Sequence, residues 1–247
     1  MGWKSRIESL AERLGYRVTP LWREDDLALE RHLIALFKAY GITTVLDVGA
    51  NAGQFGRFLR QRVGFRGIIH SFEPQPQLAQ QLRREVQSDP AWHVHAMGLG
   101  SEDAQVTLNL MASDRFSSFR MPDNQHAPQF ESSNRIVGQV EVPVRRLDGL
   151  ALGDLGQVYL KTDTQGFDLE VLRGAAGILK QVPALQFELP LVNIYAGVPG
   201  GWDMLQAVEA MGFAVSGFFP VSADAQLRMI EMDCVMVPRK VEPQAGR

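Results

Sequence analysis

The chain has 247 residues, of which 45% are hydrophobic, and a formal net charge of −3. This length allows one sizeable α/β core but not two full domains, and the charge balance offers no basic field for nucleic acid. No apolar run approaches the roughly 18–20 residues that span a bilayer, and we expect no signal peptide. The single cysteine, Cys234, cannot form an internal disulfide, so we expect a cytoplasmic protein.

Residues 1–41 predict a helical segment that precedes the first strand. Leu29, Leu33 and Leu36 fall at helical spacing, and Gly41 is a typical helix stop. Such a segment either packs against the sheet or forms a lid over a ligand.

A glycine-rich turn between a strand and a helix is the first functional signal. Residues 43–48 form an apolar run that predicts a strand, and a helical pattern over 53–63 follows the turn. Gly49 and Gly53 let the backbone approach a ligand where a Cβ atom would collide, and Asn51 adds an N–H group to the turn. Strand, turn and helix N-terminus together predict a nucleotide-cofactor site.

Two acids decide between the cofactors that such a turn can hold. Asp47 precedes the glycines, where its carboxylate would repel the pyrophosphate of NAD and suit a cationic amino group. Glu73 follows the next predicted strand, 67–72, and can accept hydrogen bonds from both ribose hydroxyls of a cofactor. The spacing Gly49-x-x-x-Gly53 also departs from the G-x-G-x-x-G of dinucleotide sites. These residues favour S-adenosylmethionine, which carries an ammonium, a sulfonium and a ribose diol.

Strands and helices alternate from residue 42 to about residue 96 and again from residue 158, which predicts a parallel sheet covered on both faces. The further predicted elements are helix 76–87, strand 92–96, strand 158–163, a helix from residue 167, strand 184–188, helix 202–211 and an antiparallel pair at 213–218 and 234–237. We expect one domain over residues 42–240, with an insertion at about 104–144 and a tail at 241–247.

The insertion is a candidate substrate site. Its ends, 104–110 and 137–144, predict the strands of a side hairpin or sheet extension, and the 111–135 segment between them is long and polar. Loops of this length in compact domains are usually functional or disordered. His126 lies in this segment and is a candidate general base, because histidine titrates near neutrality.

Two further strands end in acids, Asp163 and Glu188. Open α/β sheets bind ligands beyond the carboxyl ends of their strands, so both carboxylates are candidates for the catalytic site. Asp163 could act as a general base, ligate a metal or brace the turn at Gly166. Two acids do not complete the oxygen shell of Mg²⁺ and no His/Cys cluster accompanies them, so we predict no metal site, although Mg²⁺ stays possible.

Several segments resemble FkbM-type methyltransferases, namely Val45–Gly53, Phe72–Pro74, Ala96–Gly100, Arg146–Asp148 and, most specifically, Leu160–Ala175. The resemblance implies an α/β class I methyltransferase fold, Rossmann-like, with seven strands in the order 3-2-1-4-5-7-6 and strand 7 antiparallel. It also implies S-adenosylmethionine as cofactor, with Gly98, Leu99 and Ser101 near its adenine. Gln165 departs from the family pattern, which commonly has a glutamate there.

The favoured function is an S-adenosylmethionine-dependent O-methyltransferase that acts on a hydroxyl of a small molecule, sugar, polyketide or glycan. Oxygen as the nucleophile rests on the resemblance alone. The alternatives are an NAD-dependent oxidoreductase of Rossmann type and a non-catalytic, cofactor-binding partner of another enzyme. We expect neither a nucleic-acid partner nor a membrane span, and the sequence does not indicate the oligomeric state.

Overall fold

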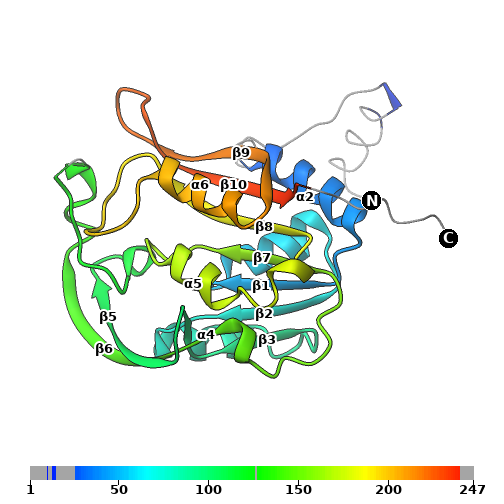
Figure 1. The fold of residues 1–247 in the computed structure, drawn as a ribbon, viewed down its shortest axis with the longest axis horizontal. Helices are drawn as coiled ribbons and strands as arrows, with labels where there is room; N and C mark the ends of the chain where they lie inside the picture. The colour runs from blue at the N-terminus through cyan, green and yellow to red at the C-terminus, as the bar shows by residue number, and fades with distance from the viewer. Residues whose placement is uncertain (1–9, 11–12, 15–25, 126, 240–247) are drawn as a thin grey trace.

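The computed structural model describes residues 10, 13–14, 26–125 and 127–239, and its core is a mostly parallel sheet (Figure 1). Within these residues the main sheet has seven strands in the order β3-β2-β1-β7-β8-β10-β9. They are β1 (Thr44–Val48), β2 (Ile68–Phe72), β3 (Trp92–His95), β7 (Val158–Thr162), β8 (Ala184–Pro190), β9 (Phe213–Ala223) and β10 (Met229–Pro238). Strand β10 runs antiparallel to both of its neighbours, β8 and β9, and the other neighbouring pairs in this sheet are parallel. This arrangement confirms the predicted class I methyltransferase topology.

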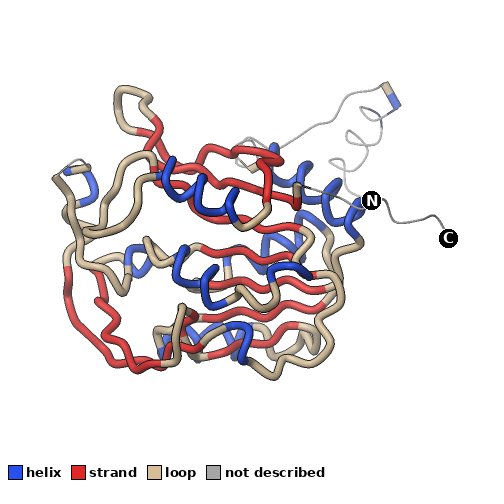
Figure 2. Tube along the Cα trace, viewed as in Figure 1, coloured by secondary structure: helices blue, strands red, loops and turns tan. Residues whose placement is uncertain are grey.

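Helices cover both faces of this sheet, as Figure 2 shows. They are α2 (Leu27–Tyr40), α3 (Gln54–Phe58), the π-helix η2 (Leu59–Val63), α4 (Pro76–Glu85), α5 (Asp168–Gly174) and α6 (Gly201–Ala210). Apolar side chains of α5 and α6 pack on one face, with Leu46 and Leu160 of the sheet. Those of α2, η2 and α4 pack on the other, with Val45 and Tyr159. The predicted helix 53–63 therefore exists, but its second half is a π-helix.

The predicted insertion folds into a small second sheet beside the main one (Figure 1). The strands β5 (Ala104–Met111) and β6 (Ile136–Arg145) form an antiparallel hairpin, and the short β4 (Gly98–Leu99) pairs in parallel with β6. Met111 and Ala127 of the insertion pack against Ile194 and Tyr195, which follow β8. The insertion is therefore held against the loop after β8.

Helix α2 covers the second half of the predicted N-terminal helical segment, and the residue that ends it, Gly41, has the left-handed conformation. Most of residues 1–25 and the predicted tail lie outside the described residues, so the predicted domain boundaries stay predictions. Within the described part of the chain, no helix combines the length and apolar character needed to cross a bilayer.

Three histidines stack on one another where β2 and β3 pair. His70 Nδ1 lies 3.0 Å from His95 Nε2, and the His70 ring centroid lies 5.0 Å from that of His93. His70 is only 7% exposed. Its burial, reinforced by the charges of the other two rings, lowers the pKa of His70 to about 4. In mild acid the unfolded chain therefore binds a proton at His70 more readily than the folded protein does.

This shift predicts that the fold loses stability in mild acid. A depressed histidine pKa means that stability is lost as the pH falls from about 6.5 towards about 4, because the unfolded state binds the proton first. His70→Gln keeps a hydrogen-bonding side chain that does not titrate. Between pH 7 and pH 5 the wild type should lose about 1–2 kcal/mol more unfolding free energy than His70→Gln, after allowance for solvent screening. Urea unfolding at both pH values measures this difference, and equal losses would contradict the assignment.

Candidate active site

A row of polar side chains crosses the main sheet near the carboxyl ends of its parallel strands. Ser71 of β2, Asp47 of β1, Lys161 of β7 and Gln186 of β8 occupy registered positions on adjacent strands. Registered residues point to the same side of a sheet, here the side covered by α2 and η2. Ser71 Oγ donates to Asp47 Oδ2 at 3.2 Å, and Lys161 Nζ lies 3.2 Å from Asp47 Oδ1. Ser71, Asp47 and Lys161 are thus joined by polar contacts inside the core.

Lys161 is the cation at the centre of this row. Its Nζ also lies 3.4 Å from Asp163 Oδ2 and 5.4 Å from the centroid of the Phe55 ring, and it donates to the Gly49 carbonyl at 3.4 Å. Burial lowers the pKa of Lys161, but the charges of Asp47 and Asp163 outweigh this effect and raise it overall. The ammonium therefore stays charged and neutralises part of the acidic charge around it.

Asp47 was predicted to face the cationic end of a cofactor. In the structure its side chain is fully buried and contacts Ser71 and Lys161. A buried carboxylate in such contacts is already paired, so Asp47 orients Lys161 in this state. Its predicted contact with a cofactor stays a prediction.

Gly49 brings the turn after β1 against the chain that follows β7. Its φ is +77°, and a Cβ atom there would lie 1.8 Å from the carbonyl oxygen of Asp163. Any other residue would push the two turns apart, so glycine is required for this close approach. The N–H of Asp163 donates to the Val48 carbonyl at 3.0 Å and locks the same junction.

Glu73 closes the glycine turn from the end of β2. Its Oε2 accepts the N–H of Asn51 at 2.7 Å, and its Oε1 accepts the N–H of Gln75 at 2.8 Å. Burial raises the pKa of Glu73 to about 7, although these two N–H groups act in the opposite direction. The carboxyl group is therefore fixed in place and changes charge near neutral pH.

These turns form one wall of a cavity of about 660 Å³, a volume within the usual range of ligand sites. The turns, β4 and Glu73 contribute one part of the lining, the insertion a second part and strand-end acids a third. The members that carry the argument are Gly49, Asn51, Glu73, Gly98, Leu99, Phe116, Phe119, Phe130, Asp163, Glu188, Glu231 and Asp233. The cavity thus gathers predicted cofactor residues and predicted catalytic residues in one space.

Three predicted cofactor residues lie outside this lining, although the structure describes all of them: Asp47, Gly53 and Ser101. Gly53 instead packs against Leu82, since a Cβ atom at Gly53 would lie 2.4 Å from Leu82 Cδ1. Gly53 therefore shapes the turn rather than the wall of the cavity.

Gln165 connects the two acids that were predicted as catalytic. Its Nε2 donates to Asp163 Oδ1 at 3.0 Å and to Glu188 Oε2 at 3.1 Å. Tyr195 Oη lies 2.9 Å from Gln165 Oε1 and 2.8 Å from the Phe116 carbonyl, and its single hydrogen can be donated to either of these two acceptors. The structure therefore brings Asp163 and Glu188 into one network and ties the insertion to it.

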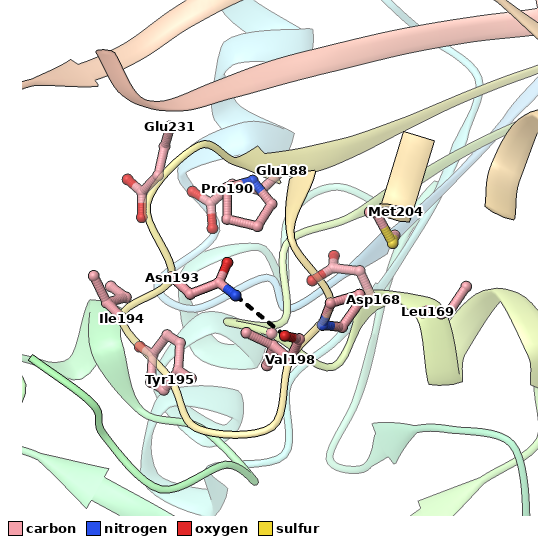
Figure 3. A pocket seen from close by; sticks show the side chains of 12 residues that line it. Asp168, Leu169, Glu188, Pro190, Asn193, Ile194, Tyr195, Val198, Met204 and Glu231 are labelled. Atoms are coloured by element: carbon pink, nitrogen blue, oxygen red, sulfur yellow. Dashed lines mark hydrogen bonds between the residues drawn. The ribbon is translucent and has the colours of Figure 1, made fainter. Parts of the chain in front are cut away.

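A second, smaller hollow of about 40 Å³ lies beyond Glu188 and is shown in Figure 3. Glu188 and Glu231 line both spaces. Burial, with the charge of Asp163 adding to it, raises the pKa of Glu188 well above its usual value. Burial also raises the pKa of Glu231, and it raises the pKa of Asp233 to about 6. Protonated carboxyl groups here can donate hydrogen bonds as well as accept them.

Glu231 and Asp233 are cavity residues that the sequence analysis missed. The signal was present, because they lie two positions apart in an apolar strand and so share a face. The structure pairs Asp233 with Glu188 across β10 and β8. His126, the predicted base of the insertion, lies outside the described residues. Among the residues that the structure describes, no three or more His, Cys, Asp or Glu side chains are placed to hold a metal ion.

Comparison with known families agrees with this architecture. The sequence family described as Methyltransferase FkbM domain matches residues 47–215, well over half of the chain. The chain therefore belongs to the FkbM methyltransferase family, which confirms the resemblance, and S-adenosylmethionine is the cofactor that this family implies. No curated protein matches the chain.

Solved structures with similar folds have low sequence identity. A methyltransferase FkbM from Methylobacillus flagellatus KT is 17% identical, with a TM-score of 0.49, over 79% of this chain but only 43% of its own length. A SAM-dependent methyltransferase from Aquifex aeolicus is 15% identical, with a TM-score of 0.42, over 96% of this chain and 100% of its own. The magnesium protoporphyrin IX methyltransferase of Synechocystis PCC 6803, solved with bound SAM, is 10% identical, with a TM-score of 0.45, over 96% and 98%.

Proposed function

We propose that this chain binds S-adenosylmethionine in the 660 Å³ cavity and transfers its methyl group to a hydroxyl of a small molecule, sugar, polyketide or glycan. One observation carries the proposal: the glycine turn at Gly49 lies directly against Asp163, so a cofactor wall and a candidate base meet in one cavity. In-line methyl transfer needs this proximity of donor and acceptor.

The residues present fit this cofactor. Gly49 and Asn51 both line the cavity, and the absence of a Cβ atom at Gly49 lets this turn lie against the Asp163 carbonyl. Glu73 would accept the hydroxyls of the ribose, and Gly98 and Leu99 would line the adenine. The cofactor supplies an electrophilic methyl group on sulfonium, and the protein has to align it and exclude water.

Asp163 is the candidate that takes the proton from the acceptor hydroxyl. Its side chain is 40% exposed and faces the cavity, whereas the Lys161 ammonium holds its Oδ2 at 3.4 Å. A positioned carboxylate assists because an alkyl hydroxyl is a poor nucleophile. Glu188, with its raised pKa, would act beside it as a hydrogen-bond donor to the acceptor.

The insertion would bind the acceptor. Phe116, Phe119 and Phe130 of the insertion line the same cavity as the glycine turn, and Arg115 also lines it. Aromatic side chains there would exclude water from the reacting groups and offer an apolar surface to the acceptor.

Cofactor choice gives the direct test. Calorimetry should show binding of S-adenosylhomocysteine and none of NAD, because the carboxylate of Asp163 and the ionised form of Glu73 line the cavity and would repel a pyrophosphate. Binding of NAD alone would instead support the oxidoreductase. Incubation with methyl-labelled S-adenosylmethionine and a panel of hydroxylated acceptors then tests turnover. Binding without transfer to any acceptor would favour a non-catalytic partner.

A further inference from the structure

Gln165 sits at the junction of the two catalytic candidates in an unusual backbone conformation. Its φ is +54°, in the left-handed region that favours glycine, and its carbonyl accepts the hydroxyl of Ser118 at 2.7 Å. Non-glycine residues adopt this region at a cost, and they persist where surrounding contacts fix them. The turn therefore directs the Gln165 side chain into the acidic end of the cavity.

The two hydrogens of the Gln165 amide point to two different carboxyl groups, those of Asp163 and Glu188. The other oxygen of Asp163 faces Lys161 at 3.4 Å. Both oxygens of Asp163 therefore have a donor, and the side chain is held between a neutral donor and a charged one. A position between two carboxylates is also the place where a cation with oxygen ligands would bind.

We propose that Gln165 is a positioning residue, whose amide orients Asp163 and fills, without charge, the position that a divalent cation would need between Asp163 and Glu188. The orienting role rests on the proposed function, because Asp163 has to be oriented only if it acts on an acceptor. The filling of the cation position rests on the contacts of Gln165 alone.

Tyr195 lies at the oxygen of this amide. An amide side chain can present either its oxygen or its nitrogen to a given neighbour. The carboxyl groups of Asp163 and Glu188 accept from the nitrogen, which leaves Gln165 Oε1 2.9 Å from Tyr195 Oη, a hydroxyl that can donate to it. Tyr195 is itself buried, and its position beside Phe116 connects it to the insertion. The orientation of Asp163 thus depends on Lys161 of β7 and Gln165 of the turn after β7, and Tyr195 of the loop after β8 contacts Gln165.

The substitution Gln165→Glu tests the position directly. It keeps the size of the side chain and places a third carboxylate beside Asp163 and Glu188, so three carboxylates could share one Mg²⁺ or Mn²⁺ ion. Gln54→Glu is the matched control, because Gln54 lines the same cavity but its amide contacts Asn51 at 3.0 Å. It adds the same charge away from the acidic pair.

The measurement is thermal unfolding of the three proteins in EDTA and in millimolar Mn²⁺. Wild type and Gln54→Glu should unfold at the same Tm in both buffers. Gln165→Glu should be less stable in EDTA and rise by about 4 °C or more in Mn²⁺. An equal rise in the wild type would overturn the proposal, because the position would then be open to a cation. No rise in a folded Gln165→Glu would also overturn it.

Two further measurements complete the test. If Gln165→Glu is unfolded in EDTA, circular dichroism after addition of Mn²⁺ replaces the Tm: recovered structure supports the proposal and none contradicts it. Gln165→Met, of similar size but without hydrogen bonds, tests positioning. It should lower kcat and leave KM for S-adenosylmethionine near normal, whereas an unchanged kcat would refute an orienting role. Calorimetry with S-adenosylhomocysteine on wild type reports separately on the proposed function.

Discussion

Asp163→Asn is expected to lower kcat by about 10²- to 10⁴-fold, the range for loss of a general base, with little effect on the affinity for S-adenosylhomocysteine. The substitution keeps the shape of the side chain, and an asparagine Oδ1 can still accept the amide hydrogen that Gln165 donates to Asp163. Lys161 keeps Asp47 as a partner. Only the charge and the basic oxygen are removed, so the experiment tests chemistry without opening a cavity.

Three measurements, two on Asp163→Asn and one on the wild type, separate the roles that Asp163 can have. Raised pH should partly restore the rate for an acidic acceptor if Asp163 is the base. EDTA should abolish the activity of the wild type if it is a metal ligand. A lower Tm of Asp163→Asn with a near-normal rate would mean that Asp163 only braces the turn, and Glu188 would be the next catalytic candidate to test. Asp203→Asn, on the exposed side of α6, is the control and should leave the rate unchanged.

The topology could be predicted because its signals are local. Apolar runs that end in acids marked the strands, and the segment Leu160–Ala175 carried the family resemblance. The structure confirms all seven main strands at positions close to those expected, although β9 and β10 extend beyond their predicted ends. Strand ends depend on pairing with a neighbour, which a single strand's pattern does not contain.

The partners of the site residues could not be predicted, because they depend on register between strands far apart in the sequence. Asp47 meets Lys161 only because β1 and β7 pair in the register that aligns them. Asp233 likewise reaches the cavity because β10 pairs with β8 opposite Glu188. A shift of one residue would move each side chain to the other face. The types of site residue could therefore be predicted from the sequence, but their partners could not.

The contact between the insertion and the loop after β8 could also not be predicted from the sequence. Pro122 and Tyr195 form an isolated antiparallel bridge, and Asn134 Nδ2 donates to the Ile194 carbonyl at 3.1 Å. Neither segment has a periodic hydrophobic pattern that predicts such a contact. Through this contact Tyr195 connects the insertion to Gln165 and so to the acidic end of the cavity.

Glu73→Ala is expected to weaken binding of S-adenosylhomocysteine by about 1.5–3 kcal/mol, the range for hydrogen bonds to a charged group. The structure adds a second effect, because Glu73 also accepts the backbone N–H groups of Asn51 and Gln75. Alanine would leave both unpaired and loosen the glycine turn. Glu73→Gln is the sharper variant, since its amide oxygen can still accept one of these hydrogens while the charge is removed.

The pKa of Glu73, about 7 in the free protein, adds a pH dependence that the substitution Glu73→Gln would remove. The ionised carboxyl accepts ribose hydroxyls best, and its fraction grows as the pH rises through that value. The dissociation constant of the wild type for S-adenosylhomocysteine should therefore fall roughly tenfold from about pH 6 to about pH 8, and that of Glu73→Gln should stay nearly constant. Calorimetry across this range measures both. Parallel pH curves for the two proteins would show that Glu73 does not contact the ribose, and an unchanged affinity in Glu73→Ala would remove it from the site.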